Sequence, residues 1–255
     1  MIVYANESPR ARAVEAALVQ AAPPEGLAPD VCVVLGGDGT MLRAIARHGG
    51  AVRYVGVNCG HLGFLMNDLP GEPGTVARTV ARLLVADRWL APRFPRLRMR
   101  AADRAGALFD ARALNDVYVE RMRGQTCHLR VTVDGVEVVR HMVCDGIVIA
   151  TSLGSTAYSF SAGGPAAHPL LRQLHVTAIC PHHPRLHPLL LPLGTTVRVE
   201  VLDAEERPAR AVSDGVAHED IVMVEIVGGS DEVTLCFAEG HNFTSTMIRK
   251  VLQGA

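Results

Sequence analysis

The sequence is short of aromatic residues, of net charge and of long apolar runs. Aromatic side chains make up 4 % of the 255 residues, and the formal net charge is −1. So small a net charge excludes an overall field that would attract DNA or an anionic membrane. A run of 18 apolar residues, as in a membrane span, and a charged-then-apolar leader are both missing. We therefore expect a cytoplasmic protein that binds neither nucleic acid nor membranes.

Cysteine pairs with metal-binding or redox spacing are also missing. None of the six cysteines forms a Cys-x-x-Cys pair, and several lie in apolar runs such as Val31–Leu35. This pattern favours buried, unpaired thiols in a reducing compartment. The histidines in "CPHHPRLHP", residues 180–188, fit no common set of zinc ligands.

Apolar residues are plentiful, at 49 %, which is enough for a sizeable core. In residues 1–70, short apolar runs alternate with helical patterns, and a further helix is expected at 75–87. The run Val31–Leu35 is continuously apolar, as expected of a strand that helices cover on both faces. A βαβαβ order of this kind predicts a parallel sheet.

The character of the sequence changes after residue 92. Many strand-like runs follow, and Asp134-Gly135 between two alternating segments predicts a hairpin. The last residues again have a helical pattern. We predict an α/β protein with a small Rossmann-like N-terminal domain at 1–92 and a larger β-rich domain at 93–238. A C-terminal helical segment at 239–255 is expected to return and pack on the first domain.

A glycine loop, Gly36-Gly37-Asp38-Gly39-Thr40, stands between an apolar run and a helical segment. Unpaired N–H groups at the start of a helix favour an anion, and glycines let phosphate oxygens come close. Asp38 would repel a phosphate, so it makes sense there as a general base or as a group that handles a metal ion. The loop therefore favours phosphoryl transfer. The alternative is a turn in which Asp38 or Thr40 caps the helix.

The loop is not one of two common nucleotide-binding motifs. A P-loop would contain Gly-Lys-Ser/Thr, and a dinucleotide-binding Rossmann loop would contain Gly-x-Gly-x-x-Gly. Neither pattern occurs at this position. An ordinary dehydrogenase therefore loses support.

Three further stretches contain polar groups that suit a ligand with ribose and phosphate groups. Asn58–Leu65 follows a predicted strand, at the end where open α/β sheets bind ligands. Asn115-Asp116 precedes another strand-like run and can bind hydroxyls. Cys144–Pro169 combines hydroxyls, glycines and Tyr158 around a short predicted helix. The alternatives are core packing for Phe64, and turns and helix caps for the polar groups.

Together, these stretches resemble the NAD kinase family. "GGDGT", "NCGHLGFL", "LNDV" and "DGIVIATSLGSTAYSFSAGGP" occur in the family's order, and the resemblance covers nearly the whole chain. It implies phosphorylation of the 2′-hydroxyl of the adenosine ribose of NAD, giving NADP. The implied donor is ATP or polyphosphate, with Mg²⁺ or another divalent cation. A homodimer or homotetramer is also implied.

The resemblance also assigns roles to single residues. Asp38 would accept the proton of the attacking hydroxyl, Phe64 would lie near the adenine, and Asp145 would contact the dinucleotide from a neighbouring subunit. The implied phosphate loop is Gly36, Gly37, Gly39 and Thr40, and no protein metal ligand is expected. The residues implied to bind NAD are Asp38, Gly39, Phe64, Asn115, Asp116, Asp145, Thr156, Ala157, Tyr158 and Ser161.

The sequence departs from the family's pattern at four positions. Asp116 stands in place of a glutamate, and Leu153 in place of a hydroxyl-bearing residue. Val143 replaces a frequent arginine, and Val216 a frequent glutamine. Two alternatives to an NAD kinase stay open. One is another Gly-Gly-Asp-Gly kinase that acts on a lipid or a sugar, because this loop is shared with such enzymes. The other, which the departures at Leu153, Val143 and Val216 suggest, is a non-catalytic protein that binds NAD or NADP.

Overall fold

The computed structural model describes residues 1–21, 30–60 and 63–252. The predicted stretch Asn58–Leu65 includes residues 61–62, and the predicted C-terminal segment includes residues 253–255; these five positions lie outside the described residues. The chain forms two compact units. The N-terminal unit comprises Met1–Phe94 and Glu232–Ala255, and the β-rich unit comprises Pro95–Asp231. The sequence-based domain boundaries after residues 92 and 238 stay a prediction.

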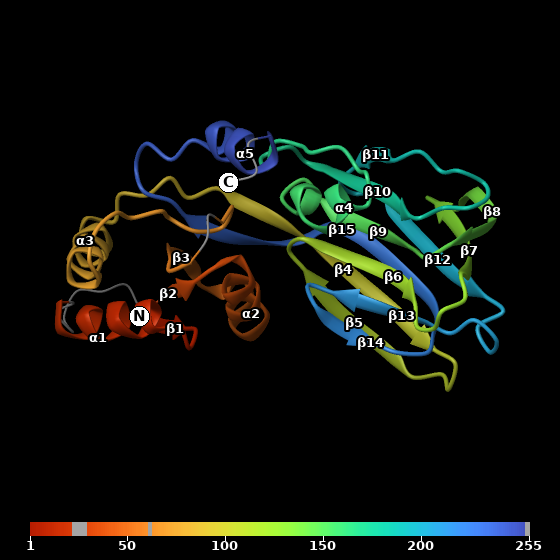
Figure 1. The fold of residues 1–255 in the computed structure, drawn as a ribbon, viewed down its shortest axis with the longest axis horizontal. Helices are drawn as coiled ribbons and strands as arrows, with labels where there is room; N and C mark the ends of the chain where they lie inside the picture. The colour runs from red at the N-terminus through yellow and green to blue at the C-terminus, as the bar shows by residue number, and fades with distance from the viewer. Residues whose placement is uncertain (22–29, 61–62, 253–255) are drawn as a thin grey trace. The chain divides into compact units, whose positions relative to one another are not determined.

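The N-terminal unit is built on a parallel sheet with the order β1-β2-β3-β15 (Figure 1). Its strands are β1 (Ile2–Ala5), β2 (Val31–Gly36), β3 (Arg53–Asn58) and the last residues of β15 (Ile221–Cys236). Its helices are α1 (Pro9–Ala21), α2 (Asp38–His48), α3 (Pro73–Ala86) and α5 (Phe243–Leu252), with a 3-10 turn at Gly49–Ala51.

Helices cover both faces of this sheet. Val33 and Leu35 pack with α1 and α3 in one apolar cluster, and Figure 1 shows these two helices side by side. On the other face, α2 comes so close to β3 that a Cβ on Gly56 would lie 2.8 Å from Met41 Cε. All six residues of β2 are buried, as its continuously apolar sequence predicts. Helix α5 is held in the same unit by edge-on contacts of Phe243 with Phe94 and Phe237.

The β-rich unit contains two sheets that share one core. The first sheet is formed by β4 (Arg93–Asp103), β5 (Leu108–Ala113), β7 (Cys127–Val133), β8 (Val136–Cys144), β12 (Thr196–Leu202) and β15. The second has the order β11 (Leu189–Pro192), β10 (Gln173–Ile179), β9 (Gly146–Thr151), β6 (Asp116–Arg121), β13 (Ala209–Ser213) and β14 (Val216–His218). Buried residues of both sheets, such as Leu129 and Ile147, belong to one apolar cluster.

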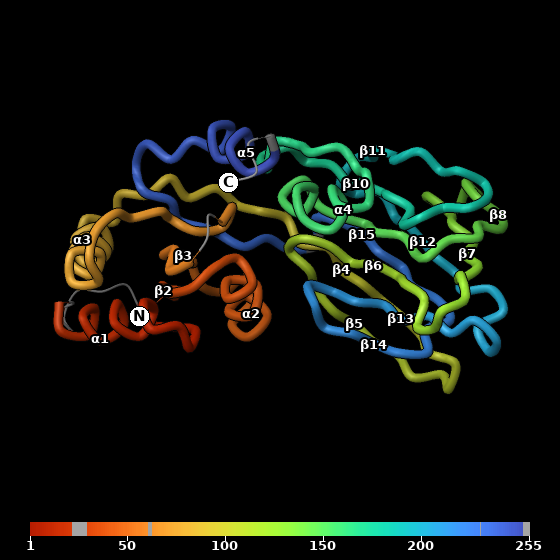
Figure 2. The backbone as a smooth tube through the Cα atoms, viewed as in Figure 1, coloured from red at the N-terminus to blue at the C-terminus, as the bar shows by residue number. Residues whose placement is uncertain are grey.

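The outer face of the second sheet carries a short helical segment. From β9 the chain passes through a 3-10 turn (Gly154–Thr156) into α4 (Tyr158–Ser161), as Figure 2 traces. Tyr118, Val148 and Ala150 pack there with Tyr158. The predicted hairpin between β7 and β8 is confirmed, because Asp134 and Gly135 form its turn with φ of 47° and 79°.

The fold class predicted from the sequence is confirmed, with a Rossmann-like α/β part, a larger β-rich part and a C-terminal helix. None of the helices in the described part of the chain has the length and hydrophobicity that crossing a membrane requires. The prediction for the cysteines is correct for five of the six, which are buried and free. It is wrong for Cys180, whose free thiol is exposed just after β10.

Candidate functional site

The glycine loop joins β2 to α2, as the sequence predicts. Helix α2 starts at Asp38, and Gly37 is its N-cap in an extended conformation. In the described structure, the partners of the Asp38 carboxylate are Phe64, Leu65 and Lys250, and that of the Thr40 hydroxyl is the Arg43 guanidinium. Neither side chain accepts a backbone N–H at the start of α2, so the capping alternative does not apply. A Cβ added to Gly37 would meet no atom within 4 Å. One side of the loop is therefore open to a ligand.

The Asp38 carboxylate is held by a second loop of the same unit. Its Oδ2 accepts the N–H of Phe64 at 2.9 Å, and its Oδ1 accepts the N–H of Leu65 at 3.0 Å. A Cβ on Gly63 would lie only 2.2 Å from Oδ1, so this close approach requires a glycine. The structure thus fixes the orientation of the predicted base and brings it next to Phe64, which is 6 % exposed.

A cation that the sequence analysis missed completes this group. Lys250, in the last turn of α5, places Nζ 3.1 Å from Asp38 Oδ2 and 4.5 Å from the centroid of the Phe64 ring. One signal was available in the sequence: Lys250 is the single lysine, and the other basic residues are all arginine. Both partners of this ion pair are about one quarter exposed, so the pair is accessible to solvent.

A cavity of about 350 Å³ lies in the same unit, beside the loop that holds Asp38. Gly63 lines it together with Asn67 and Asp68 on one side and the start of α5 on the other. Its charged lining residues are Asp68, Glu239 and Arg249. Burial lowers the pKa of His241, which also lines the cavity, so this imidazole is neutral near pH 7.

The β-rich unit brings a second set of predicted residues together. Asn115 and Asp116 lie at the start of β6, and the loop after β9 packs directly on them. Thr151 N donates to Asn115 O at 2.9 Å, and a Cβ on Gly154 would lie 2.1 Å from that oxygen. The segment that holds Thr156 and Ala157 is therefore fixed next to Asn115, as the sequence-based site requires.

Asp116 is paired with an acid that the sequence analysis did not identify as a site residue. The Asp214 carboxylate accepts N–H groups from Leu114, Asn115 and Asp116, at 2.6 to 3.3 Å. Burial raises the pKa of Asp116 to about 7, and the charge of Asp214 adds to this rise. Burial also raises the pKa of Asp214. The signal in the sequence was the Asp214-Gly215 turn.

Three further predicted residues of this unit, Tyr158, Ser161 and Asp145, differ in their exposure and contacts. Tyr158 packs edge-on against Tyr118, with ring centroids 4.8 Å apart. Burial raises the pKa of Tyr158, so its hydroxyl stays protonated near neutral pH. Ser161 is exposed at the end of α4. Asp145 pairs with Arg121 at 2.7 Å.

The structure shows the exposure of two of the four residues that depart from the family's pattern, Leu153 and Val216. Leu153 is 5 % exposed, so its apolar side chain fills buried space rather than facing a ligand. Val216 is 55 % exposed in β14. Asp38, Phe64 and Lys250 belong to the N-terminal unit, and Asn115, Asp116 and Tyr158 belong to the β-rich unit.

Comparison with known proteins agrees with this arrangement of motifs. Residues 11–88 match the model of the ATP-NAD kinase N-terminal domain, and residues 114–235 match that of the ATP-NAD kinase C-terminal domain. An NAD kinase from Cereibacter sphaeroides is 36 % identical over 241 residues, which cover 93 % of this chain and 91 % of the relative. An NAD kinase from Rickettsia akari is 33 % identical over 228 residues, covering 88 % and 86 %.

Solved structures are similar over almost the whole chain. A crystal structure of an NAD kinase from Archaeoglobus fulgidus in complex with ATP has a TM-score of 0.77 and 26 % identity, covering 98 % of this chain and 97 % of the other. Yeast NADH kinase complexed with NADH has a TM-score of 0.82 at 20 % identity, covering 100 % and 87 %, which shows the shared fold. The two matched domains and the two bacterial relatives establish that this chain belongs to the NAD kinase family.

Proposed function

We propose that this protein transfers the γ-phosphoryl group of ATP to the 2′-hydroxyl of the adenosine ribose of NAD, giving NADP. The observation that carries this proposal is the Asp38 carboxylate, held by two backbone N–H groups beside an open glycine loop. Membership of the family and the ATP complex of the relative from Archaeoglobus fulgidus support the choice of acceptor and donor. Neither a lipid or sugar kinase nor a non-catalytic binder is favoured by these relatives.

Asp38 is the general base in this proposal. The 2′-hydroxyl gives its proton to a carboxylate oxygen of Asp38 while its own oxygen attacks the γ-phosphorus. The bond from the γ-phosphorus to the bridging oxygen breaks, and ADP leaves. A positioned base contributes about 10²- to 10⁴-fold in rate. The fixed orientation of Asp38 is what such a role requires, because proton transfer depends on distance and angle.

Lys250 is a positioning residue in this mechanism. Its ammonium lies 3.1 Å from Asp38 Oδ2 and holds the orientation of the carboxylate before the hydroxyl arrives. The ammonium of Lys250 also lies over the Phe64 ring, 4.5 Å from its centroid. Helix α5 would therefore contribute to the site, although it lies at the other end of the sequence from the glycine loop.

The β-rich unit supplies the residues proposed to hold the dinucleotide. Asn115 and Asp116 offer amide and carboxyl groups for ribose hydroxyls, and the segment from Thr156 to Ser161 offers hydroxyls and backbone N–H groups. The Asp116 carboxyl is buried next to Asp214. A ribose hydroxyl of NAD that donates to Asp116 would give this buried carboxyl a hydrogen-bond partner. Asp145 remains proposed to contact the dinucleotide bound by a neighbouring subunit.

The cavity of the N-terminal unit is the proposed place for the donor's phosphates. Arg249 brings a positive charge to it. Asp68 and Glu239 line the same cavity. No protein metal ligand is expected from the sequence; in this proposal the two carboxylates would hold a magnesium ion together with the phosphates of the donor. Such an ion would neutralise charge on the transferred group.

Three further features belong to the same proposal. Polyphosphate is proposed as a second donor, since its phosphate chain would meet the same Arg249 guanidinium. A homodimer or homotetramer is proposed because of the role given to Asp145. A cytoplasmic location is proposed from the buried free thiols.

A matrix of donors and acceptors tests this function. Folded protein with Mg²⁺ is offered ATP or polyphosphate as donor and NAD, NADH, a sugar or a diacylglycerol as acceptor, and products are identified by mass. We expect NADP from NAD with ATP, and a strong loss in Asp38→Asn. If Asp38→Asn formed NADP as fast as the wild type does, Asp38 would not be the general base. Tight binding of NAD without turnover with any donor would show a non-catalytic binder.

A further inference from the structure

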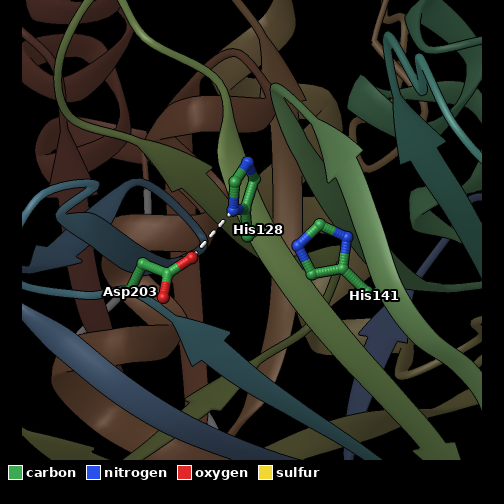
Figure 3. A group of neighbouring side chains, drawn as sticks. All are labelled: His128, His141 and Asp203. Carbon is green, nitrogen blue, oxygen red and sulfur yellow. Dashed lines mark hydrogen bonds and ion pairs between the residues drawn. The ribbon is translucent and has the colours of Figure 1, made fainter.

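Two histidines and an aspartate form a group on one surface of the β-rich unit (Figure 3). His128 belongs to β7, His141 to β8, and Asp203 follows β12. One ring nitrogen of each histidine and one carboxylate oxygen of Asp203 lie within 4.8 Å of one another. Figure 3 shows His128 between the other two side chains.

The strand register explains why these residues meet. His128 lies opposite Val143 of β8 and opposite Leu202 of β12. His141 is two residues from Val143, so its side chain is on the same face of the sheet. Asp203 directly follows Leu202 and has a φ of 55°, which turns the chain. Its carboxylate thereby reaches His128 Nδ1 at 2.9 Å.

We propose that His128, His141 and Asp203 bind a divalent transition-metal ion of the zinc type. Two imidazoles and one carboxylate are ligands that Zn²⁺, Co²⁺ and Ni²⁺ accept, whereas Mg²⁺ prefers oxygen ligands alone. This site is thus chemically distinct from the one proposed for the donor's cation. Three protein ligands would leave at least one position for water.

The distances are compatible with such an ion after small side-chain movements. Ligands about 2.1 Å from a tetrahedral zinc ion lie about 3.4 Å from each other. The His128 and Asp203 ligand atoms are already 2.9 Å apart, and the rings of His128 and His141 have their centroids 4.6 Å apart. His141 is exposed, and the Asp203 side chain is 56 % exposed. Both can therefore rotate toward a shared ion.

The charges nearby do not oppose a cation. Arg130, on the same face of β7 as His128, is paired with Glu200 at 3.1 Å. Its positive charge is therefore offset by a carboxylate. An ion at this site would join β7, β8 and β12, so that its binding would stabilise the folded β-rich unit by mass action.

Calorimetric titration of the chelator-treated full chain with Zn²⁺ tests the proposal, using protein without a histidine tag. Visible absorption of Co²⁺ gives a second readout of the ligands. We expect one equivalent of Zn²⁺ to bind, with at least tenfold weaker binding in His141→Ala and in Asp203→Asn. His187→Ala is the matched control, because His187 is exposed and outside the group; it should bind as the wild type does.

Each outcome decides the matter. The site is supported if His141→Ala and Asp203→Asn no longer bind the one equivalent of Zn²⁺ while His187→Ala still does. A rise in Tm with Zn²⁺ that disappears in His141→Ala supports it as well. Binding that is equal in wild type and His141→Ala would place the ion elsewhere, for example at the exposed thiol of Cys180. Absence of binding up to millimolar Zn²⁺ by folded protein would also overturn the proposal. NADP formation with Mg²⁺ serves as the check on folding, and it should be unchanged in His141→Ala.

Discussion

Lys250 Nζ lies 3.1 Å from the Asp38 carboxylate, between residues that are 212 positions apart in the chain. The same ammonium lies 4.5 Å from the centroid of the Phe64 ring. Three parts of the N-terminal unit therefore meet at one carboxylate: the glycine loop, the loop around Phe64 and helix α5. Because the chain uses arginine at every other basic position, the lysine here indicates a requirement for a compact, single-point cation.

Replacing Lys250 by methionine tests this requirement. Methionine is an unbranched side chain like lysine but carries no charge, so it removes the ammonium from Asp38 and from the Phe64 ring. We expect kcat/KM for NAD to fall roughly tenfold, equivalent to about 1.4 kcal/mol, with a fall in kcat larger than the change in KM. Unfolding free energy should change by less than about 1 kcal/mol, since the ion pair is partly exposed.

The matched control for this variant is Arg82→Met, which removes an exposed cation from α3 of the same unit. Its activity should stay near that of the wild type. Lys250→Arg should restore part of the activity lost in Lys250→Met, because it restores the charge with a different geometry. Full activity in Lys250→Met would contradict the positioning role.

The close approach of Gly63 to Asp38 gives a second prediction. In Gly63→Ala the added Cβ would lie 2.2 Å from Asp38 Oδ1, so the carboxylate must move. Because a displacement of about 1 Å can cost about 100-fold in rate, we expect a loss of that order in kcat. Steady-state kinetics measures it, and circular dichroism checks the fold.

Gly60→Ala is the control for that substitution. A Cβ on Gly60 would meet no atom within 4 Å, and the residue lies in the same stretch after β3. Its activity should be close to that of the wild type. A Gly63→Ala protein that is as active as Gly60→Ala would mean that the orientation of Asp38 is not critical.

Gly154 allows the corresponding test in the β-rich unit. Its Cβ would lie 2.1 Å from Asn115 O, so Gly154→Ala should push the loop away from Asn115. Overpacking of this kind typically costs 1 to 3 kcal/mol in stability. We also expect weaker binding of NAD, measured by titration at a temperature where the variant is folded.

The control is Gly124→Ala, in the turn between β6 and β7, where a Cβ would have free space within 4 Å. Binding of NAD should be unchanged in this variant. If Gly154→Ala were destabilised yet bound NAD as tightly as the wild type, the loop would have a structural role only.

These relationships mark the limit of what the sequence predicts. Local patterns were sufficient for the strand at Val31–Leu35, because its apolar run is what a strand buried on both faces requires, and for the Asp134-Gly135 hairpin. The glycine loop was also correctly placed between a strand and a helix. Such features depend on neighbours in the chain.

Contacts between segments that are far apart in the chain could not be predicted from such local sequence patterns. The single lysine and the Asp214-Gly215 turn stand out in the sequence, but neither indicates that these side chains meet Asp38 or the amides around Asn115, about 100 or more positions away. The exposure of Cys180 was also missed, since the residue follows an apolar strand and only the turn after β10 brings it to the surface. Register and loop packing decide these contacts.

The buried Asp116 predicts how stability depends on pH. Its pKa is raised to about 7 in the folded protein, mainly by burial and then by Asp214, from 3.8 for an unperturbed aspartate. Between these values the folded state binds more protons than the unfolded state. Stability should therefore fall as the pH rises from about 4 to about 7, with a slope of up to roughly 1.4 kcal/mol per pH unit for one such group.

Asp116→Asn removes this titration. The pH dependence of the unfolding free energy between pH 5 and pH 8, measured with urea, should become weaker than in the wild type. Some dependence should persist, because burial raises the pKa of Asp214 in the same direction. Glu219→Gln, at an exposed position of the same unit, should keep the wild-type slope. An identical slope in Asp116→Asn and the wild type would mean that Asp116 is ionised throughout this range, and that the hydroxyl it is proposed to bind meets a carboxylate rather than a carboxylic acid.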